Sequence, residues 1–409
     1  MSESPTGLVA MRVRWPCEAG GHARQETTFS YKELELQRLA TTVIYGWLLN
    51  IVCIAGIFGN ILSYIVMRSK EYRGSTTAIY LQVLMIVDSL YLLSNLCYYG
   101  IIIGCGVGKW IIDPFAAYIR IYVSYSLIDI FRNCSVLLTL VVTAERYICV
   151  CHSLKANKVC TPNKSKIISG ITVTITVVYE IPRFFILKVI STSIDNCEGN
   201  FYTIDASGLV SDEVENVLGI LGFVIFLALP LVMLTILTIL LLMTIKKSNH
   251  FRKSMRSMTR SSAQTSSSGD KAKKANRKSE NNTTVILLSV VITALICSLP
   301  NTIFTLLGFT AFRDIIIQTL PGSIAYYLAI LLLNVNSAAN VILFGFFGKK
   351  FRRVFARIFI KCYWGERNRK AYQIGSQTGI THTEHLMREN GCHEEGENSM
   401  EATESSPLR

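Results

Sequence analysis

Charged residues are scarce in this chain and unevenly placed. Lys, Arg, Asp and Glu make up 17% of the 409 residues, whereas 50% are hydrophobic. No charged residue occurs between residues 217 and 245. A water-soluble protein of this length needs a polar surface around its core, and so few charges cannot cover one. The composition therefore excludes an assembly of two or three soluble domains.

The chain instead contains hydrophobic runs long enough to cross a bilayer, which takes about 20 residues each. We place seven of them, at 43–67, 78–104, 115–150, 167–189, 217–245, 285–309 and 315–347. Such runs form helices, because backbone polar groups must be satisfied internally in lipid. The sequence predicts an all-α membrane protein: a seven-transmembrane helix bundle over 43–347, preceded by an extracellular N-terminal segment, 1–42.

Basic residues gather on one side of the predicted spans. Residues 246–278 contain eleven Lys or Arg against one acid, Asp270, whereas 191–215 contain six acids and no base. Lys and Arg favour the cytoplasmic side, so we expect an extracellular N-terminus, a cytoplasmic C-terminus and a multi-pass location in the plasma membrane. The net charge of +13 then reflects topology and not nucleic-acid binding.

Three polar segments flank or interrupt the spans. The Ser-, Thr- and Lys-rich stretch 246–280 predicts a disordered third cytoplasmic loop, and 363–409 predict a disordered cytoplasmic tail. The first 41 residues have no apolar core suited to a cleavable signal peptide. We therefore expect the first span to act as its own insertion signal.

A carboxylate, Asp88, lies in the middle of the second span. At that depth it costs roughly 2.5–3.5 kcal/mol, so it should face polar partners inside the bundle. The candidates are polar residues of other spans: Asn60, Ser135, Asn336, Ser337 and Asn340. This set could hold a small hard cation such as Na⁺, or it could be a hydrogen-bonded core that only fixes helix register. Both interpretations stay open, and we expect no other metal or cofactor.

Prolines occur within three spans or near their ends, at Pro182, Pro230 and Pro300. A proline inside a helix leaves a carbonyl unpaired and bends the axis. The bends at Pro230 and Pro300 favour a bundle built to move, although static kinks are the simpler interpretation.

The third span ends in "ERY", which is Glu145, Arg146 and Tyr147. Glu280 opens the sixth span at the same cytoplasmic level. Arg146 can pair with Glu280 across the helices or with Glu145 beside it. We predict a charged latch there that a conformational change can release.

Six short motifs occur in successive order along the chain: "GN" at 59–60, "LMIVD" ending at Asp88, "ERY", "LALP" ending at Pro230, "CSLP" at 297–300 and "NSAANVILF" at 336–344. From about residue 43 to 362 the chain resembles a rhodopsin-like (class A) G-protein-coupled receptor. The resemblance implies a receptor that catalyses nothing itself and activates a heterotrimeric G protein. It also implies a short amphipathic eighth helix at 348–362, in which Cys362 is a palmitoylation candidate.

Within that family, "YEIPRFF" at 179–185 and "AERYICVCHSLKANKVCT" at 144–161 look like invertebrate FMRFamide-type neuropeptide receptors. This implies a short amidated peptide as the ligand. The acidic segment 191–215 would attract a cationic peptide, although solvation of an outer loop would explain it equally simply. Receptor kinases and arrestin are implied partners, acting on Ser and Thr of 254–268 and of the tail.

The outer halves of the spans supply the candidate ligand pocket: Tyr98, Tyr99, Tyr125, Asp129, Asn301, Thr305 and Tyr326. Asp129 is the candidate countercharge for an arginine of the ligand. An intrahelical pair with Arg132, three residues on, is the equally weighted alternative.

Several residues depart from the family pattern. Ser298 replaces the usual sixth-span tryptophan, Val341 and Phe344 replace the seventh-span proline and tyrosine, and Thr238 replaces a fifth-span tyrosine. The usual cysteine at the outer end of the third span is also missing. The resemblance then makes Cys105 the candidate disulfide partner of Cys197, with Cys17 as its rival.

Other classes fit less well. Residues 314–348 contain no lysine for a retinal Schiff base, and Ile128 holds the place of the usual aspartate of amine receptors. A receptor for an amine or a lipid is the first alternative. A secondary transporter is the second, and it lacks the expected internal repeat. No pair of His, Glu or Asp sits at metal-ligand spacing in a span, so we expect no enzyme.

Overall fold

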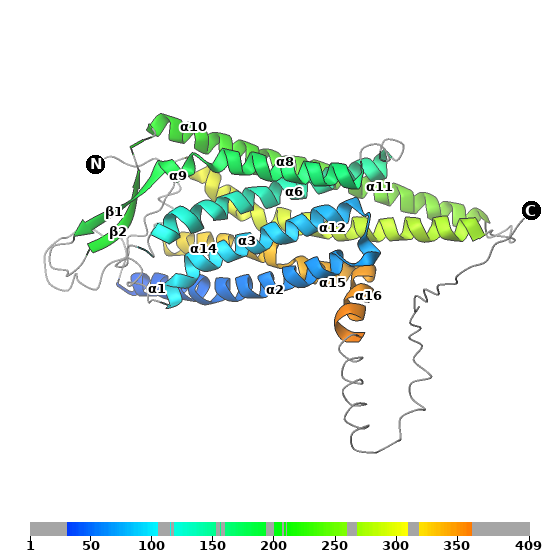
Figure 1. Ribbon diagram of the computed structural model, residues 1–409, viewed down its shortest axis with the longest axis horizontal. Helices are drawn as coiled ribbons and strands as arrows, with labels where there is room; N and C mark the ends of the chain where they lie inside the picture. Colours follow the sequence, from blue (N-terminus) through cyan, green and yellow to red (C-terminus); the bar gives the residue numbers. More distant parts are fainter. Residues whose placement is uncertain are drawn as a thin grey trace, which may run out of the picture. The chain divides into compact units, whose positions relative to one another are not determined.

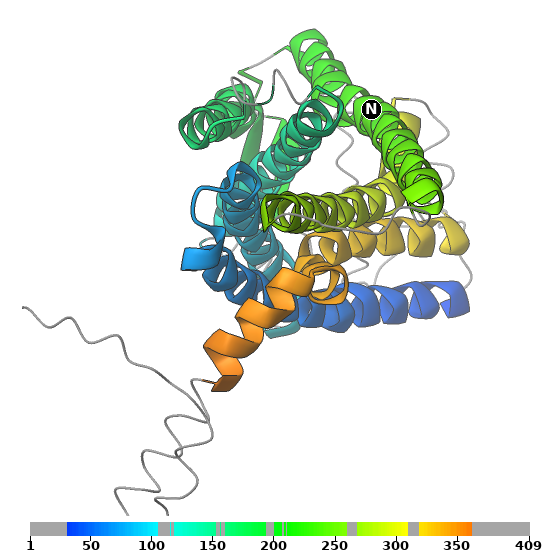
Figure 2. The same ribbon diagram turned by 90° about the vertical axis from the view of Figure 1, so that its right-hand side faces the viewer.

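The computed structural model describes residues 31–104, 115, 118–152, 156, 160–193, 200–206, 208–209, 211–259, 268–309 and 319–361. The chain divides into two units, Met1–Val354 and Phe355–Arg409. The first unit contains the long helices, which lie side by side in Figure 1 and are seen end-on in Figure 2. Of the second unit, the structure describes the end of α16 and the π-helical turn η6 (Ala356–Lys361).

All seven predicted spans are helical in the first unit, several of them assembled from successive segments. In chain order they are α1 (Tyr31–Thr41) with η2 (Thr42–Leu48) and α2 (Leu49–Met67); α3 (Thr76–Gly104); η4 (Ile119–Tyr125) with α6 (Ser126–Cys151); α8 (Pro162–Glu180); α10 (Asp212–Gly222) with η5 (Phe223–Ala228) and α11 (Leu229–Thr259); α12 (Ser268–Leu307); and α14 (Leu320–Ala338) with α15 (Asn340–Phe347). A one-turn helix, η3 (Lys70–Tyr72), follows α2, and a short helix, α16 (Lys349–Phe355), follows α15.

Six of these helical stretches are long and apolar enough to cross a membrane, and α8 is the exception. Lys164, Lys166 and five Ser or Thr residues lower the hydropathy of α8. Its hydroxyls are nevertheless satisfied, because each donates to a carbonyl one turn earlier, as Thr172 does to Ile168 and Thr176 to Thr172. Such local bonds let a Ser- and Thr-rich helix lie in a bilayer.

The fourth span ends earlier than the predicted residue 189. Helix α8 stops at Glu180, two residues before Pro182, and the single turn α9 (Arg183–Ile186) leads into strand β1 (Leu187–Ser193). Strand β1 pairs antiparallel with β2 (Asn200–Ala206), with Leu187 opposite Ala206. The prediction of helix over 187–189 was wrong, because β-branched and aromatic residues on both sides of a short loop favour a hairpin there.

The fifth and sixth helices extend into the segment 246–280, which the sequence predicts to be a disordered loop. Helix α11 continues to Thr259 and α12 begins at Ser268. Most of the predicted disordered loop, 246–280, is therefore helical, and 260–267 lie outside the described residues. Lysine, arginine and alanine in this stretch are good helix formers. Composition alone does not distinguish a polar helix of these residues from a disordered linker.

Apolar side chains face outward and polar ones face inward in the bundle. Along α2 the exposed residues are Ile51, Ile54, Phe58, Ile61 and Ile65, whereas Cys53, Asn60 and Ser63 are buried. This is the reverse of a soluble protein and indicates that lipid covers the outer face. Helix α3 packs against α2 and α6, and α14 packs against α2 and α12, so the polar residues of these helices meet in the centre.

Irregular segments mark where the helices can bend. The π-helical segment η5 comes directly before Pro230, and Pro300 lies inside α12. The seventh helix is interrupted at Ala339, between α14 and α15. Prolines and π-helical turns both disturb the regular hydrogen-bond ladder.

Candidate functional site

Asp88 of α3 is the centre of the buried polar core. Its Oδ1 accepts hydrogen bonds from Ser135 Oγ at 2.7 Å and from Ser337 Oγ at 3.1 Å. Its Oδ2 accepts one from Asn340 Nδ2 at 2.7 Å. These donors come from α6, α14 and α15, so a single carboxylate joins three of the membrane helices.

Asn60 extends this core to α2. Its Nδ2 donates to the Ser337 carbonyl at 3.0 Å, and its Oδ1 lies 3.5 Å from Asn340 Nδ2. Asn60 is fully buried, and Asp88 and Asn340 are each 2% exposed. The structure therefore brings together five of the six residues predicted for this site.

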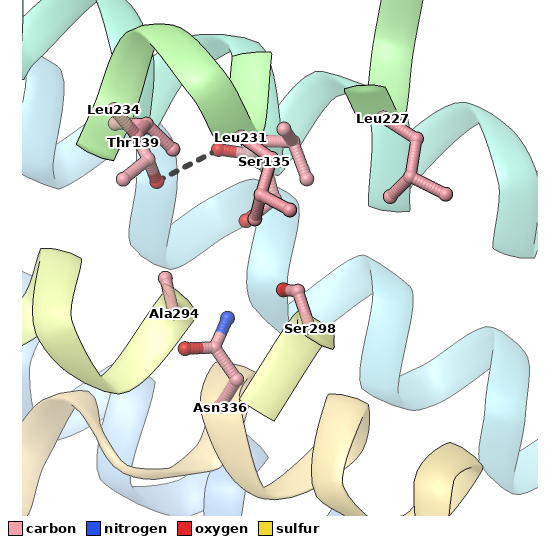
Figure 3. Close-up of a pocket in the computed structure, with 9 residues that line it drawn as sticks. Ser135, Thr139, Leu227, Leu231, Leu234, Ala294, Ser298 and Asn336 are labelled. Atoms are coloured by element: carbon pink, nitrogen blue, oxygen red, sulfur yellow. Dashed lines mark hydrogen bonds between the residues drawn. The ribbon is translucent and has the colours of Figure 1, made fainter. Parts of the chain in front are cut away.

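Asn336, the sixth, lies on the wall of a neighbouring cavity (Figure 3). Ser135, Thr139 and Ser298 share that wall with leucines of α11. Figure 3 shows Asn336 and Ser298 on one side of the cavity and Ser135 and Thr139 on the other. Because Ser135 also bonds Asp88, polar atoms continue from the carboxylate to the cavity, where hydroxyl and amide oxygens are of the type that a hard cation prefers.

Arg146 lies near the C-terminal end of α6. Its Nη2 donates to Thr76 Oγ1 at 3.0 Å and to Glu145 Oε1 at 3.3 Å. Arg146 is thus held by its neighbour and by the first residue of α3, a contact that the sequence did not predict. Glu280 belongs to α12, but its side chain lies outside the described residues. Tyr147 stacks edge-on against His152 with ring centroids 5.8 Å apart.

Tyrosines form a continuous cluster near the opposite end of the bundle. Tyr98 contacts Tyr99 and Tyr125, with ring centroids 4.7 Å and 6.4 Å apart. Tyr99 in turn lies 4.6 Å from Tyr45, and Tyr45 lies 4.9 Å from Tyr327. The cluster joins η2, α3, η4 and α14, and it includes three of the four predicted pocket tyrosines directly.

Tyr326, the fourth, packs on Phe304 of α12 at 5.5 Å and on Tyr327 at 6.4 Å. The sequence did not single out Tyr45, Tyr327 or Phe304. Tyr45 and Tyr327 are buried apolar-run residues, and their helical register alone does not show that they meet.

Asp129 forms the intrahelical ion pair that was one of its two interpretations. Its Oδ1 lies 2.8 Å from Arg132 Nη2. Asn301 is buried, and its carbonyl accepts the hydroxyl of Thr305 at 2.9 Å. These three candidates therefore already have partners within their own helices.

The profile of the serpentine type 7TM GPCR chemoreceptor Srw family matches residues 48–362, which contain the polar core, the arginine and all of the tyrosine cluster except Tyr45. The chain belongs to this family of G-protein-coupled receptors. The predicted rhodopsin-like resemblance and the seven-transmembrane fold are thereby confirmed.

Curated relatives of the receptor carry peptide-receptor names. The FMRFamide receptor of Drosophila melanogaster is 24% identical over 328 residues, which are 78% of this chain and 54% of that protein. The FMRFamide peptide receptor frpr-18 of Caenorhabditis elegans is 28% identical over 143 residues, 35% of this chain and 33% of that protein. Somatostatin receptor type 1 of Mus musculus is 24% identical over 343 residues, which are 83% of this chain and 76% of that protein. The matched part of this chain thus covers about half of the length of the Drosophila relative and about a third of that of the Caenorhabditis relative.

Among the positions that depart from the family pattern, Ser298, Thr238 and Phe344 are buried, and Val341 is half-buried. Ser298 is 8% exposed and lines the cavity of Figure 3, so space that the usual tryptophan would fill remains open. Phe344 is fully buried and packs on Phe351 with ring centroids 5.7 Å apart. Val341 packs against Gly59. Apolar packing thus stands where the resemblance leads one to expect a tyrosine.

The short helix α16 contacts the connection between α2 and α3. Lys350 Nζ donates to the Glu71 carbonyl and lies 4.3 Å from the centre of the Tyr72 ring. Burial raises the pKa of Tyr72 to about 12 and lowers the pKa of Lys350. On the inner face Phe351 and Val354 are buried, whereas Arg352 and Arg353 are exposed, which is an amphipathic arrangement.

Four predicted cysteine assignments lie outside the described residues. They concern Cys105, Cys197 and Cys17 for the disulfide, and Cys362 for palmitoylation. They stay predictions. Two other cysteines that the sequence did not single out, Cys149 and Cys160, have their sulfurs 3.0 Å apart near the C-terminal end of α6.

Proposed function

We propose that this receptor binds a short amidated, FMRFamide-like neuropeptide at its outer end and activates a heterotrimeric G protein at its cytoplasmic end. The observation that carries the proposal is the tyrosine cluster around Tyr99, at the end of the bundle away from Arg146. The FMRFamide-receptor names of the Drosophila and Caenorhabditis relatives support it.

The chemistry of such a peptide matches the outer end. A Phe-Met-Arg-Phe-amide peptide has two phenyl rings, two cationic groups (the arginine and the N-terminal amine) and no carboxylate at its C-terminus. Tyrosine rings pack well against phenyl rings and thioethers. The six acids of 191–215 would raise the local concentration of a cationic peptide.

The ion pair of Asp129 and Arg132 changes how a ligand arginine would be bound. Arg132 is about one-third exposed and Asp129 is almost buried. A ligand guanidinium would have to compete with Arg132 for Asp129. We therefore assign the attraction of the cation to the acidic segment 191–215, and the packing of its aromatic rings to the tyrosines.

The cytoplasmic latch explains how binding would produce a signal. Arg146 is held by Glu145 and Thr76, and Glu280 of α12 is the proposed third partner. A ligand must favour the active state by about 5.5 kcal/mol to move a 1:99 population to 99:1. Separation of α12 from α6 would free Arg146 and open a surface for the G protein.

The orientation in the membrane follows from the distribution of charge. Eleven basic residues in 246–278 favour the cytoplasm, which puts the N-terminus outside the plasma membrane and the C-terminus inside. Ser and Thr of 254–268 and of the tail are then accessible to receptor kinases and, after phosphorylation, to arrestin. The receptor itself catalyses no reaction in this scheme.

A sodium ion is the proposed cofactor of the resting state. Asp88, Ser135 and Asn336 supply carboxylate, hydroxyl and amide oxygens, the ligand types that a hard cation prefers. Ser337 and Asn340 would have to turn their donors away from Asp88, which binding of a cation would favour. The same residues without an ion form a hydrogen-bonded core, so the proposal needs its own test.

A screen of amidated neuropeptides against cells expressing the receptor tests the proposed function. Signalling would be read through a promiscuous G protein, with the free-acid form of each peptide as the matched control. We expect a response to amidated peptides that is lost with the free acids. A response to a biogenic amine or a lipid, and to no peptide, would overturn the peptide assignment and leave the receptor class intact.

A further inference from the structure

Two thiols and a buried carboxylate meet at the cytoplasmic end of α6. The sulfurs of Cys149 and Cys160 are 3.0 Å apart, and the ligand atoms of Glu145, Cys149 and Cys160 all lie within 4.8 Å of one another. Glu145 and Cys149 are four residues apart and share one face of the helix. The three groups therefore converge from a helix and from the segment that precedes α8.

Backbone hydrogen bonds hold Cys160 in this position. The Ala156 N–H donates to the His152 carbonyl at 3.0 Å, and the Cys160 N–H donates to the Ala156 carbonyl at 2.8 Å. Two successive bonds of this spacing extend from the end of α6 to Cys160. The approach of Cys160 to Cys149 is thus anchored by the backbone and does not depend on a side-chain rotamer alone.

Glu145 has an oxygen for which the described residues provide no donor. Its side chain is 7% exposed, and Oε1 accepts from Arg146. Oε2 is buried and makes no hydrogen bond within the described part of the chain. A buried acceptor without a partner is unfavourable, and a bound ligand would supply the missing partner.

We propose that Glu145 Oε2, Cys149 Sγ and Cys160 Sγ bind a zinc ion. Thiolate and carboxylate are ligands that zinc accepts in tetrahedral sites, and three protein ligands leave a fourth position for water. Coordination through Oε2 leaves Oε1 with Arg146. The three ligand atoms lie away from the tyrosine cluster, so this zinc site does not depend on which ligand activates the receptor.

The charges of such a site balance. Zinc replaces the proton of each thiol, so two protons go to solvent and no oxidant or reductant is required. Two thiolates and one carboxylate carry −3 and the zinc ion +2. The guanidinium of Arg146 next to Glu145 offsets the remaining −1.

Oxidation of the two thiols to a disulfide is the competing chemistry at this place. It requires an oxidant, and the cytoplasm keeps thiols reduced. The two sulfurs would have to separate slightly to bind zinc, because Zn–S bonds of about 2.3 Å at a tetrahedral angle keep sulfurs about 3.8 Å apart. That adjustment needs only a small rotation of one side chain.

Cobalt is the probe for the test, because Co²⁺ bound by thiolates in a tetrahedral site has a characteristic charge-transfer absorption. Purified, reduced full-length receptor would be titrated with Co²⁺ and then with Zn²⁺. We expect a thiolate–cobalt spectrum that zinc displaces, and at least a tenfold loss of zinc affinity in Cys160→Ser and in Glu145→Gln. Cys151→Ser is the matched control, since Cys151 lies two residues beyond Cys149 and faces Thr244 at 3.4 Å.

A measurement on the unaltered receptor guards against variants that fail to fold. Zinc should protect Cys149 and Cys160, identified by peptide mass spectrometry, from maleimide labelling, and should leave Cys151 reactive. The proposal is overturned if zinc protects none of them or Cys151 equally. An octahedral cobalt spectrum without a thiolate band, or a Cys149–Cys160 disulfide in receptor isolated under reducing conditions, would also overturn it.

Discussion

Asn133 of α6 donates a hydrogen bond from Nδ2 to Glu180 Oε1 of α8 at 2.7 Å. Glu180 is fully buried and Asn133 is 6% exposed. This bond joins the third and fourth membrane helices at the last residue of α8.

Replacement of Glu180 should loosen the fourth helix. Glu180→Ala leaves Asn133 without this acceptor, and we expect a loss of about 1–3 kcal/mol, measured as a lower thermal unfolding midpoint of purified receptor in detergent. Glu180→Gln keeps an acceptor oxygen and should recover most of the loss. Thr174→Ala, an exposed hydroxyl on the same helix, should have little effect. Equal midpoints for Glu180→Ala and Thr174→Ala would contradict the assigned role.

Close contact between α2 and the seventh helix depends on Gly56. A Cβ at this position would lie 2.6 Å from both Ala338 Cβ and Leu92 Cδ1, and 2.9 Å from the Ala338 backbone. Gly56→Ala should therefore lower the thermal midpoint, because a backbone atom has to move. Gly170→Ala is the control, since nothing lies within 4 Å of a Cβ there. At Gly170, alanine should be neutral or stabilise the helix by up to about 1 kcal/mol.

The sequence was sufficient for the polar core because membrane insertion makes polar residues costly. Asp88 had to have partners, and Asn60, Ser135, Ser337 and Asn340 are those partners. Asn336 and Asn340 are four residues apart, so an unbroken helix would place both on the same face. The interruption of the helix at Ala339 breaks that spacing, and Asn336 lines the adjacent cavity instead.

The residues that were missed lacked a signal of this kind or had an ambiguous one. Glu180 is a buried acid, but it precedes Pro182 by two residues, where a span could equally have ended. The contact of Thr76 with Arg146 and that of Cys149 with Cys160 depend on how loops return to the bundle. The hydrophobic pattern along one helix does not show which residues a loop brings back into contact with that helix.

Loss of the latch should raise signalling without ligand. Glu280→Gln removes the proposed partner of Arg146 on α12, and Glu145→Gln weakens the bond that the structure contains. We expect increased basal G-protein activation from each at matched surface expression. Glu213→Gln, an exposed acid of α10, should leave it unchanged. Basal activity of Glu280→Gln equal to that of the unaltered receptor would remove Glu280 from the latch and leave Glu145 and Thr76.

Sodium should reduce agonist affinity if the ion occupies the polar core in the resting state. The effect would be measured by agonist binding in sodium buffer against choline buffer of equal ionic strength. Asp88→Asn should abolish the difference, because it removes the charge that binds the ion. Ser89→Ala, whose hydroxyl bonds the Met85 carbonyl of its own helix, should preserve it. A sodium effect that persists in Asp88→Asn would exclude this site.

The central claim is that a ligand at the tyrosine cluster frees Arg146 at the other end of the bundle for a G protein. The most direct test is nucleotide exchange on purified heterotrimeric G protein, measured with receptor in lipid nanodiscs and an amidated peptide identified by the screen. The account predicts that the peptide accelerates exchange, that its free acid does not, and that Arg146→Ala abolishes the acceleration while peptide binding persists. Acceleration that is undiminished in Arg146→Ala would contradict the account.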